Sequence, residues 1–194
     1  MNQESVMQAT QKWLEEVVIG LNLCPFAAKP NRLKQIRTVV CEAGAKDQDF
    51  EDDILGCLEM ELKLLDINTP EQVETTLIVI PNTLQNFDDY NQFLDYAEFV
   101  LQRGGWEGTY QIASFHPDYC FADAHPDDDE NLTNRSPYPI LHLIREASLE
   151  EAIEKYPDTE EIPNNNIERV EGLTDKEKAK LFSYLIDKTK SKSY

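Results

Sequence analysis

The run from Glu74 to Ile80, with the sequence ETTLIVI, constrains the fold more than any other segment of the chain. It is rich in β-branched residues and is followed by Pro81, which predicts a β-strand that ends there. Its second half is apolar without interruption, a pattern typical of a central strand that is covered on both faces. We therefore expect a sheet with further structure packed on each side.

Strand and helix patterns alternate on either side of this run. Strands are predicted over residues 36–42, 109–115 and 140–145, and helices over about 5–20 and 88–103, with others around 54–65, after Ser148 and after Thr174. This alternation favours an α/β fold with an about four-stranded mixed sheet flanked by helices. An α+β, ferredoxin-like sandwich is the main alternative. The length suits one compact domain over residues 1–194, of which 173–194 form a C-terminal helix and a polar tail.

The charge balance narrows the range of partners. Asp and Glu number 37 against 18 Lys and Arg, which gives a formal net charge of −19. Phosphate binding needs clustered basic residues, so this composition argues against nucleic acid and against an anionic membrane surface. The N-terminal segment lacks a signal-peptide pattern, no stretch is apolar enough to span a membrane, and the four cysteines form no CxxC pair. We therefore expect a cytoplasmic protein with reduced thiols.

Residues 116–139 form a long loop between two predicted strands, 24 residues without clear periodicity. Compact domains seldom contain such loops unless they function or are disordered, and Tyr119, Phe121 and Tyr138 argue for order. His116 is expected at the C-terminal end of a strand, the edge at which α/β sheets bind ligands. The three histidines at 116, 125 and 142 and the arginines at 135 and 145 all lie in or beside this loop.

A second segment of interest is GLNLCPF, residues 20–26, in which Cys24 precedes Pro25. Proline is favoured at the first position of a helix, so Cys24 is expected to face the free backbone N–H groups of a short turn. Such groups stabilise a thiolate and lower its pKa. The alternative is that Cys24 is a small buried apolar residue, which is the interpretation we prefer for Cys41 and Cys57.

Five stretches are distinctive: VIGLNLCPFA at 18–27, ETTL at 74–77, ASFHPDY at 113–119 followed by Phe121 and Ala122, Asn131 with NRSPYP at 134–139, and LHLIRE at 141–146. Together, over about residues 5–172, they resemble the bacterial domain of unknown function 1415 family. The resemblance implies a small bacterial cytoplasmic protein and supplies no activity. His125 with the acidic run after it, and the tail after Gly172, do not resemble the shared pattern.

The first functional hypothesis is an enzyme that acts on a small anionic molecule, such as a thiol-dependent hydrolase or transferase. Its pocket would lie between the 20–27 turn and the 116–139 loop. Cys24 would be the nucleophile, His116 the acid/base and Arg135 the anion anchor. Further ligand contacts are expected from Asn134, Ser136, Tyr119, His142 and Arg145. Structural interpretations compete with these roles, because His116 can cap a strand end, Arg135 can brace the loop through its carbonyls, and His142 can be a buried structural side chain.

Two other hypotheses are a Zn-type site and a non-catalytic module. The metal site would use Cys24, His116, Cys120 and His142, although no standard zinc spacing is present. The module would bind a small ligand or a protein partner. The sequence carries neither a GxGxxG motif nor a P-loop, which weighs against nicotinamide and nucleoside triphosphate chemistry and leaves the cofactor undefined. Strand alternation places His142 and Ile144 on one face, opposite Leu141, Leu143 and Arg145.

Overall fold

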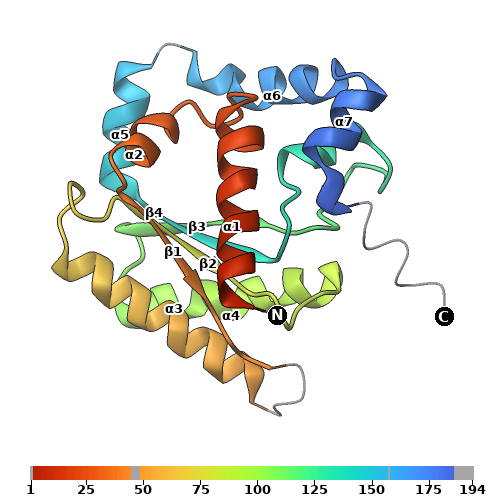
Figure 1. Ribbon diagram of the computed structural model, residues 1–194. Coiled ribbons are helices and arrows are strands. Elements are labelled where there is room, and N and C mark those ends of the chain that lie inside the picture. Colours follow the sequence, from red (N-terminus) through yellow and green to blue (C-terminus); the bar gives the residue numbers. More distant parts are fainter. Residues whose placement is uncertain (1, 45–48, 157, 186–194) are drawn as a thin grey trace.

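A computed structural model describes residues 2–44, 49–156 and 158–185. Figure 1 shows a central sheet with helices on both faces. Its strands are β1 (Ile36–Val40), β2 (Thr75–Val79), β3 (Tyr110–Phe115) and β4 (Ile140–Arg145), in the order β1-β2-β4-β3. β1 and β2 are parallel, whereas β4 is antiparallel to both of its neighbours. The predicted α/β class with a four-stranded mixed sheet is confirmed, and the ferredoxin-like alternative is wrong because β3 and β4 follow each other without an intervening helix.

Helices α3 (Phe50–Ile67) and α4 (Phe87–Gly104) cover the first face of the sheet (Figure 1). The apolar side chains of α3 recur every three or four residues, so they form one stripe that packs against Ile78 of β2 and Leu141 and Leu143 of β4. All five residues of β2 are buried, as its uninterrupted apolar sequence predicts. The buried members of this layer from the two helices are Ile54, Cys57, Leu58, Leu62, Leu65, Tyr90, Phe93, Ala97 and Leu101.

The second face is covered by the N-terminal and C-terminal segments. α1 (Gln3–Trp13) continues directly into a π-helix, η1 (Leu14–Ile19), and both pack against Leu77 and Val79 of β2 and Ile140 of β4. α6 (Ile162–Glu171) and the short α7 (Asp175–Leu181) add Val170 and Phe182 to this layer. The first and last parts of the chain therefore meet on one side of the sheet.

Several boundaries differ from those predicted. The helix predicted over 5–20 begins earlier, at Gln3 after the N-cap Asn2, and changes to a π-helix at Leu14. α5 (Glu146–Lys155) follows β4 directly instead of beginning at Ser148. The remaining elements are α2 (Ala28–Arg32) and the 3₁₀-helices η2 (Asp129–Thr133) and η3 (Thr159–Glu161). The polar tail 189–194 lies outside the described residues. Within the described residues, no helix combines the length and the apolar character needed to cross a membrane.

Candidate functional site

A pocket of about 830 Å³ opens on the second face of the sheet, beside the part that α1 and η1 cover. Its floor is formed by side chains of all four strands, among them Ile36, Leu77, His142, Ala113 and Phe115. The segment 24–33 lines one side and α5 another. The size is typical of a small-molecule site. The pocket includes the predicted 20–27 turn, but the 116–139 loop contributes nothing to its lining.

The π-helix positions the turn that carries Cys24. Two of its backbone hydrogen bonds span five residues, from Gly20 N–H to the Glu15 carbonyl and from Leu23 N–H to the Val18 carbonyl. Such an i→i+5 pattern is rare and occurs frequently at functional sites. Glycine is required at position 20, because a Cβ there would lie 2.3 Å from the carbonyl oxygen of Glu16. Asn22 then adopts a left-handed conformation, with φ of 53°, and the chain reverses toward Cys24.

α6 fixes this turn from outside. The Asn166 side chain donates a hydrogen bond to the Leu23 carbonyl at 2.7 Å, and Arg169 donates to the Leu21 carbonyl at 2.5 Å. Both carbonyls precede Cys24 directly, so the position of the thiol depends on a helix more than 140 residues further along the chain. No local sequence pattern could have indicated this support.

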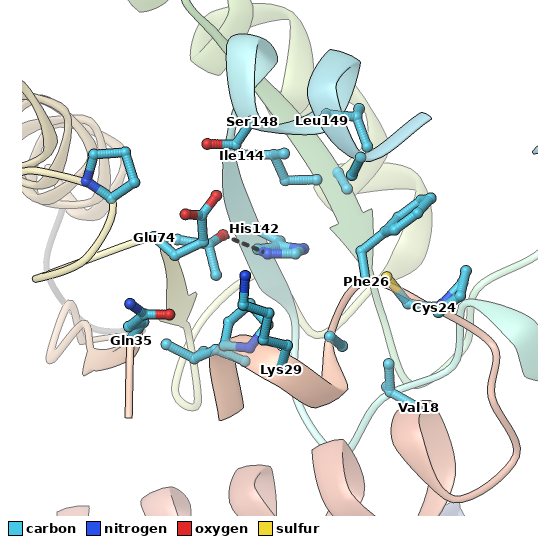
Figure 2. Close-up of a pocket in the computed structure, with 18 of the residues that line it drawn as sticks. Val18, Cys24, Phe26, Lys29, Gln35, Glu74, His142, Ile144, Ser148 and Leu149 are labelled. Carbon is cyan, nitrogen blue, oxygen red and sulfur yellow. Dashed lines mark hydrogen bonds between the residues drawn. The ribbon is translucent and has the colours of Figure 1, made fainter. Parts of the chain in front are cut away.

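Cys24 is half-buried and faces the pocket (Figure 2). The backbone N–H groups of Phe26 and Ala27 are hydrogen-bonded to its sulfur, as the Cys-Pro turn predicts, and they lower the pKa of the thiol. Burial acts in the opposite direction and outweighs them, so the net pKa is raised above the ordinary value. The sequence-based expectation of a lowered pKa is therefore wrong in sign, because it took account of the N–H groups and not of the apolar surroundings.

His142 lies at the centre of the pocket floor (Figure 2). Its Nε2 is 2.7 Å from the hydroxyl oxygen of Thr75, and that hydroxyl also bonds to the Leu143 carbonyl. A hydroxyl has one proton, which Thr75 donates to the carbonyl, so its oxygen accepts from His142 Nε2–H. The neutral ring therefore carries its lone pair on Nδ1, which has no hydrogen-bond partner within the described part of the chain. In Figure 2 this second nitrogen is on the side of Phe26 and Cys24.

Burial lowers the pKa of His142 to about 4, because the low-polarity surroundings disfavour the charged ring. The ring is therefore neutral near pH 7. His142 and Ile144 both line the pocket, which confirms the strand alternation inferred from the sequence. The pocket thus presents one oriented hydrogen-bond acceptor in a largely apolar floor.

His116, the predicted acid/base, is fully buried and lies outside the residues that line the pocket. Its Nε2 is 3.0 Å from the Leu84 carbonyl, and its Nδ1 accepts a hydrogen bond from Asp118 N–H. The ring packs against Phe87 and Tyr90, with centroids 5.3 and 5.1 Å away. Both nitrogens are used to hold the start of the loop against α4, so the structure does not bring His116 together with Cys24 in the pocket.

The other predicted ligand contacts from the loop also hold the loop itself together. Arg135 donates to the carbonyls of Tyr119 and Pro126 at 3.2 and 2.6 Å, which matches its structural interpretation. Asn134 donates to the Ser114 carbonyl, and Ser136 donates to the Tyr138 carbonyl. The Tyr119 ring packs on Phe87 and Phe121. None of these four residues lines the pocket.

Arg145 lies on the opposite face of the sheet from His142. Its guanidinium donates to the carbonyls of Leu65, Asn68 and Val73 and lies 5.7 Å from the centroid of the Tyr110 ring. It therefore closes the end of α3 onto the sheet and does not reach the pocket.

The alternative metal set is not assembled. Cys120 interacts with the carbonyls of Phe121 and Ala124, away from the pocket that contains Cys24 and His142. Among the described residues, no group of three or more His, Cys, Asp or Glu side chains is placed to hold a metal ion.

The pocket also contains polar residues that the sequence reasoning missed. Glu74 and Thr75 are the polar entry to an otherwise apolar central strand, a contrast that could have drawn attention to them. Lys29 from α2 and Ser148 from α5 carry no comparable signal in the sequence, because their placement depends on how these helices pack.

Comparison with known proteins gives a family without an activity. A family model described as a protein of unknown function, DUF1415, matches residues 5–180. The chain therefore belongs to this family, as the sequence resemblance indicated. No curated protein and no solved structure matches the chain.

We predict that the pKa of His142 affects stability at acid pH. The unfolded ring binds a proton below about pH 6.5, whereas the folded ring stays neutral until about pH 4, so the free energy of unfolding falls as pH decreases through this window. The loss is up to about 3 kcal/mol. Urea denaturation from pH 7 to pH 4 measures it. His142→Gln retains a donor for Thr75 without titrating, so its curve should be flatter; equal slopes for the two proteins would contradict the assignment.

A second prediction separates a structural from a ligand-binding role for Arg145. Arg145→Met leaves the carbonyls of Leu65 and Asn68 without their donor, so the free energy of unfolding should fall by about 2–4 kcal/mol. Ligand binding in the pocket should be unchanged in the folded variant. Chemical denaturation is the measurement, and Arg103→Met, at the exposed end of α4, is the control. Unchanged stability would contradict the structural role.

Proposed function

We propose that this protein binds a small amphipathic organic molecule in the pocket on the second face of the sheet. The observation that carries the proposal is the state of His142: its Nε2 is held by Thr75, and its Nδ1 faces an otherwise apolar floor without a protein partner in the described residues. A partly buried acceptor of this kind gains from a ligand that donates a hydrogen bond to it. The apolar body of the ligand would rest on the remainder of the floor.

The charged groups at the pocket extend the expectation of an anionic ligand. Arg135 and Arg145, the cations expected from the sequence, are engaged elsewhere. Lys29 lies at the pocket and forms no ion pair within the described residues. We assign to Lys29 the role of anion anchor that the sequence suggested for Arg135. The proposed ligand therefore has an anionic group and an apolar body.

A second candidate is thiol catalysis in the same pocket, and the hydrogen bonds from Phe26 and Ala27 to the Cys24 sulfur favour it. In this version Cys24 gives its proton to His142 Nδ1, and the resulting thiolate attacks an acyl carbon of the substrate. The imidazolium returns the proton to the leaving group, and water then hydrolyses the thioester. His142 replaces His116 as the base. Because the ligand-free pocket disfavours both charged forms, binding is the function that the geometry supports first.

We further propose that the protein is bacterial and acts in the cytoplasm. The family resemblance implies this origin and location, and all four cysteines are free thiols, which suits a reducing compartment.

Binding can be tested with anilinonaphthalene sulfonate, an anionic aromatic dye that fluoresces in apolar sites. We expect one dye per chain. Ala152 of α5 lines the pocket, so Ala152→Trp should fill it and weaken dye binding at least about tenfold. Glu154→Trp, on the same helix but outside the lining, should bind the dye as the wild type does. Equal dye affinity in the two variants would contradict the proposal.

The reactivity of Cys24 tests the second candidate. Because burial raises the pKa of its thiol, we expect iodoacetamide to modify Cys24 at pH 7 more slowly than a free cysteine, with the rate increasing through pH 9. Peptide mass spectrometry separates it from Cys120, and a Cys120→Ser variant serves as the control. Rapid modification of Cys24 at pH 7 would show that the backbone N–H groups outweigh burial, and would favour thiol catalysis over binding alone.

A further inference from the structure

The charged side chains at the pocket fall into two groups. Glu151 and Lys155 of α5 pair with each other, and the Glu71 carboxylate is hydrogen-bonded to Thr69. These three side chains are therefore already satisfied by protein partners. Glu74 and Lys29 have no side-chain hydrogen bond or ion pair within the described residues, and they do not pair with each other. One carboxylate and one ammonium thus remain available at the pocket.

Glu74 is the more informative of the two. It is half-buried, directly precedes β2, and is the neighbour of Thr75, which orients His142. Partial burial of a carboxylate costs free energy unless a donor satisfies it, and no protein donor does so in the described part of the chain. Lys29 is exposed and reaches the same region from α2. Figure 2 shows Glu74 and the tip of Lys29 toward one end of the pocket and Phe26 and Cys24 toward the other.

The two ends of the pocket therefore differ in character. The charged end offers one acceptor and one donor of opposite sign, whereas the far end is bounded by Val18, Phe26 and Leu149. A ligand with only a carboxylate would leave Glu74 without a partner and would be repelled by it. A ligand with only an ammonium would leave Lys29 unused. A ligand that carries both groups satisfies both side chains and can place an apolar side chain at the far end.

We propose that the ligand is a zwitterion with a large apolar side chain, an amino acid or a short peptide, whose ammonium binds Glu74 and whose carboxylate binds Lys29. The inference rests on the proposed function, because it names the ligand of the same pocket. A cavity of about 830 Å³ has room for a dipeptide as well as for a single amino acid.

The test uses four probes that differ in charge. L-phenylalanine and L-leucyl-L-phenylalanine carry both charges, L-phenylalaninamide carries only the ammonium, and N-acetyl-L-phenylalanine carries only the carboxylate. Titrations followed by amide chemical shifts give the affinities and locate the binding site. At least one zwitterion should bind about tenfold more tightly than either singly charged probe, because it forms one more charge-assisted pair.

Two variants assign the charges. Glu74→Gln should remove the preference for a zwitterion over N-acetyl-L-phenylalanine, and Lys29→Met should remove the preference over the amide. Arg32→Met, on α2, and Glu150→Gln, on α5, lie outside the pocket lining and should preserve both preferences. Thermal melts confirm that each variant is folded.

The outcomes separate this inference from the proposed function. If the dye binds in the pocket but the singly charged probes equal the zwitterions, or if neither zwitterion binds, the zwitterion inference is overturned and the pocket proposal stands. If Ala152→Trp and Glu154→Trp bind the dye equally, the pocket proposal itself fails.

Discussion

The pairing of β2 with β4 is the constraint on which the rest of the structure depends. These two strands occupy the centre of the sheet, so both of their faces have to be shielded from water. α3 and α4 shield the first face along its length. α1 and η1 shield the second face over Leu77, Val79 and Ile140, but beside them the sheet also presents Thr75, His142 and Ile144. The pocket exists because one layer of helices covers the sheet less completely than the other.

This incomplete cover explains why polar residues occur in the middle of an apolar sheet. Thr75 and His142 lie opposite each other on β2 and β4, and they satisfy each other together with the Leu143 carbonyl. The arrangement leaves a single ring nitrogen for whatever enters the pocket. Because the surroundings keep the ring neutral, that nitrogen is an acceptor whose direction is set by the backbone of two strands. Rigid strands hold such a group more precisely than a loop does.

The sequence was sufficient to predict those features that depend on neighbouring residues. The strands, the central place of β2 and the shared face of His142 and Ile144 all follow from local periodicity. The Cys-Pro turn also follows, since it depends on consecutive residues. The partners of the 116–139 loop could not be predicted, because the sequence does not indicate which carbonyls Arg135 reaches or that His116 turns toward α4.

The sign of the Cys24 pKa shift and the identity of the pocket wall are long-range properties of the same kind. Burial of Cys24 depends on the packing of the sheet, α2 and α5 around it, and these elements are separated by more than 100 residues. Lys29 and Ser148 become pocket residues only through this packing. A residue type that suits catalysis, such as histidine or arginine, was therefore a weaker guide to the site than the position of a polar residue on a half-covered strand.

The π-helix makes the pocket sensitive to the length of the chain as well as to its composition. An α-helix turns by about 100° per residue, and each i→i+5 bond accommodates one residue more than an α-helical turn holds. Removing one residue from Leu14–Ile19 would allow regular α-helical bonding, and everything after it would rotate by about 100° relative to α1. Cys24 would then leave the pocket although every pocket residue was still present. Within this family, an alignment gap in this segment would therefore mark a chain whose pocket is built differently.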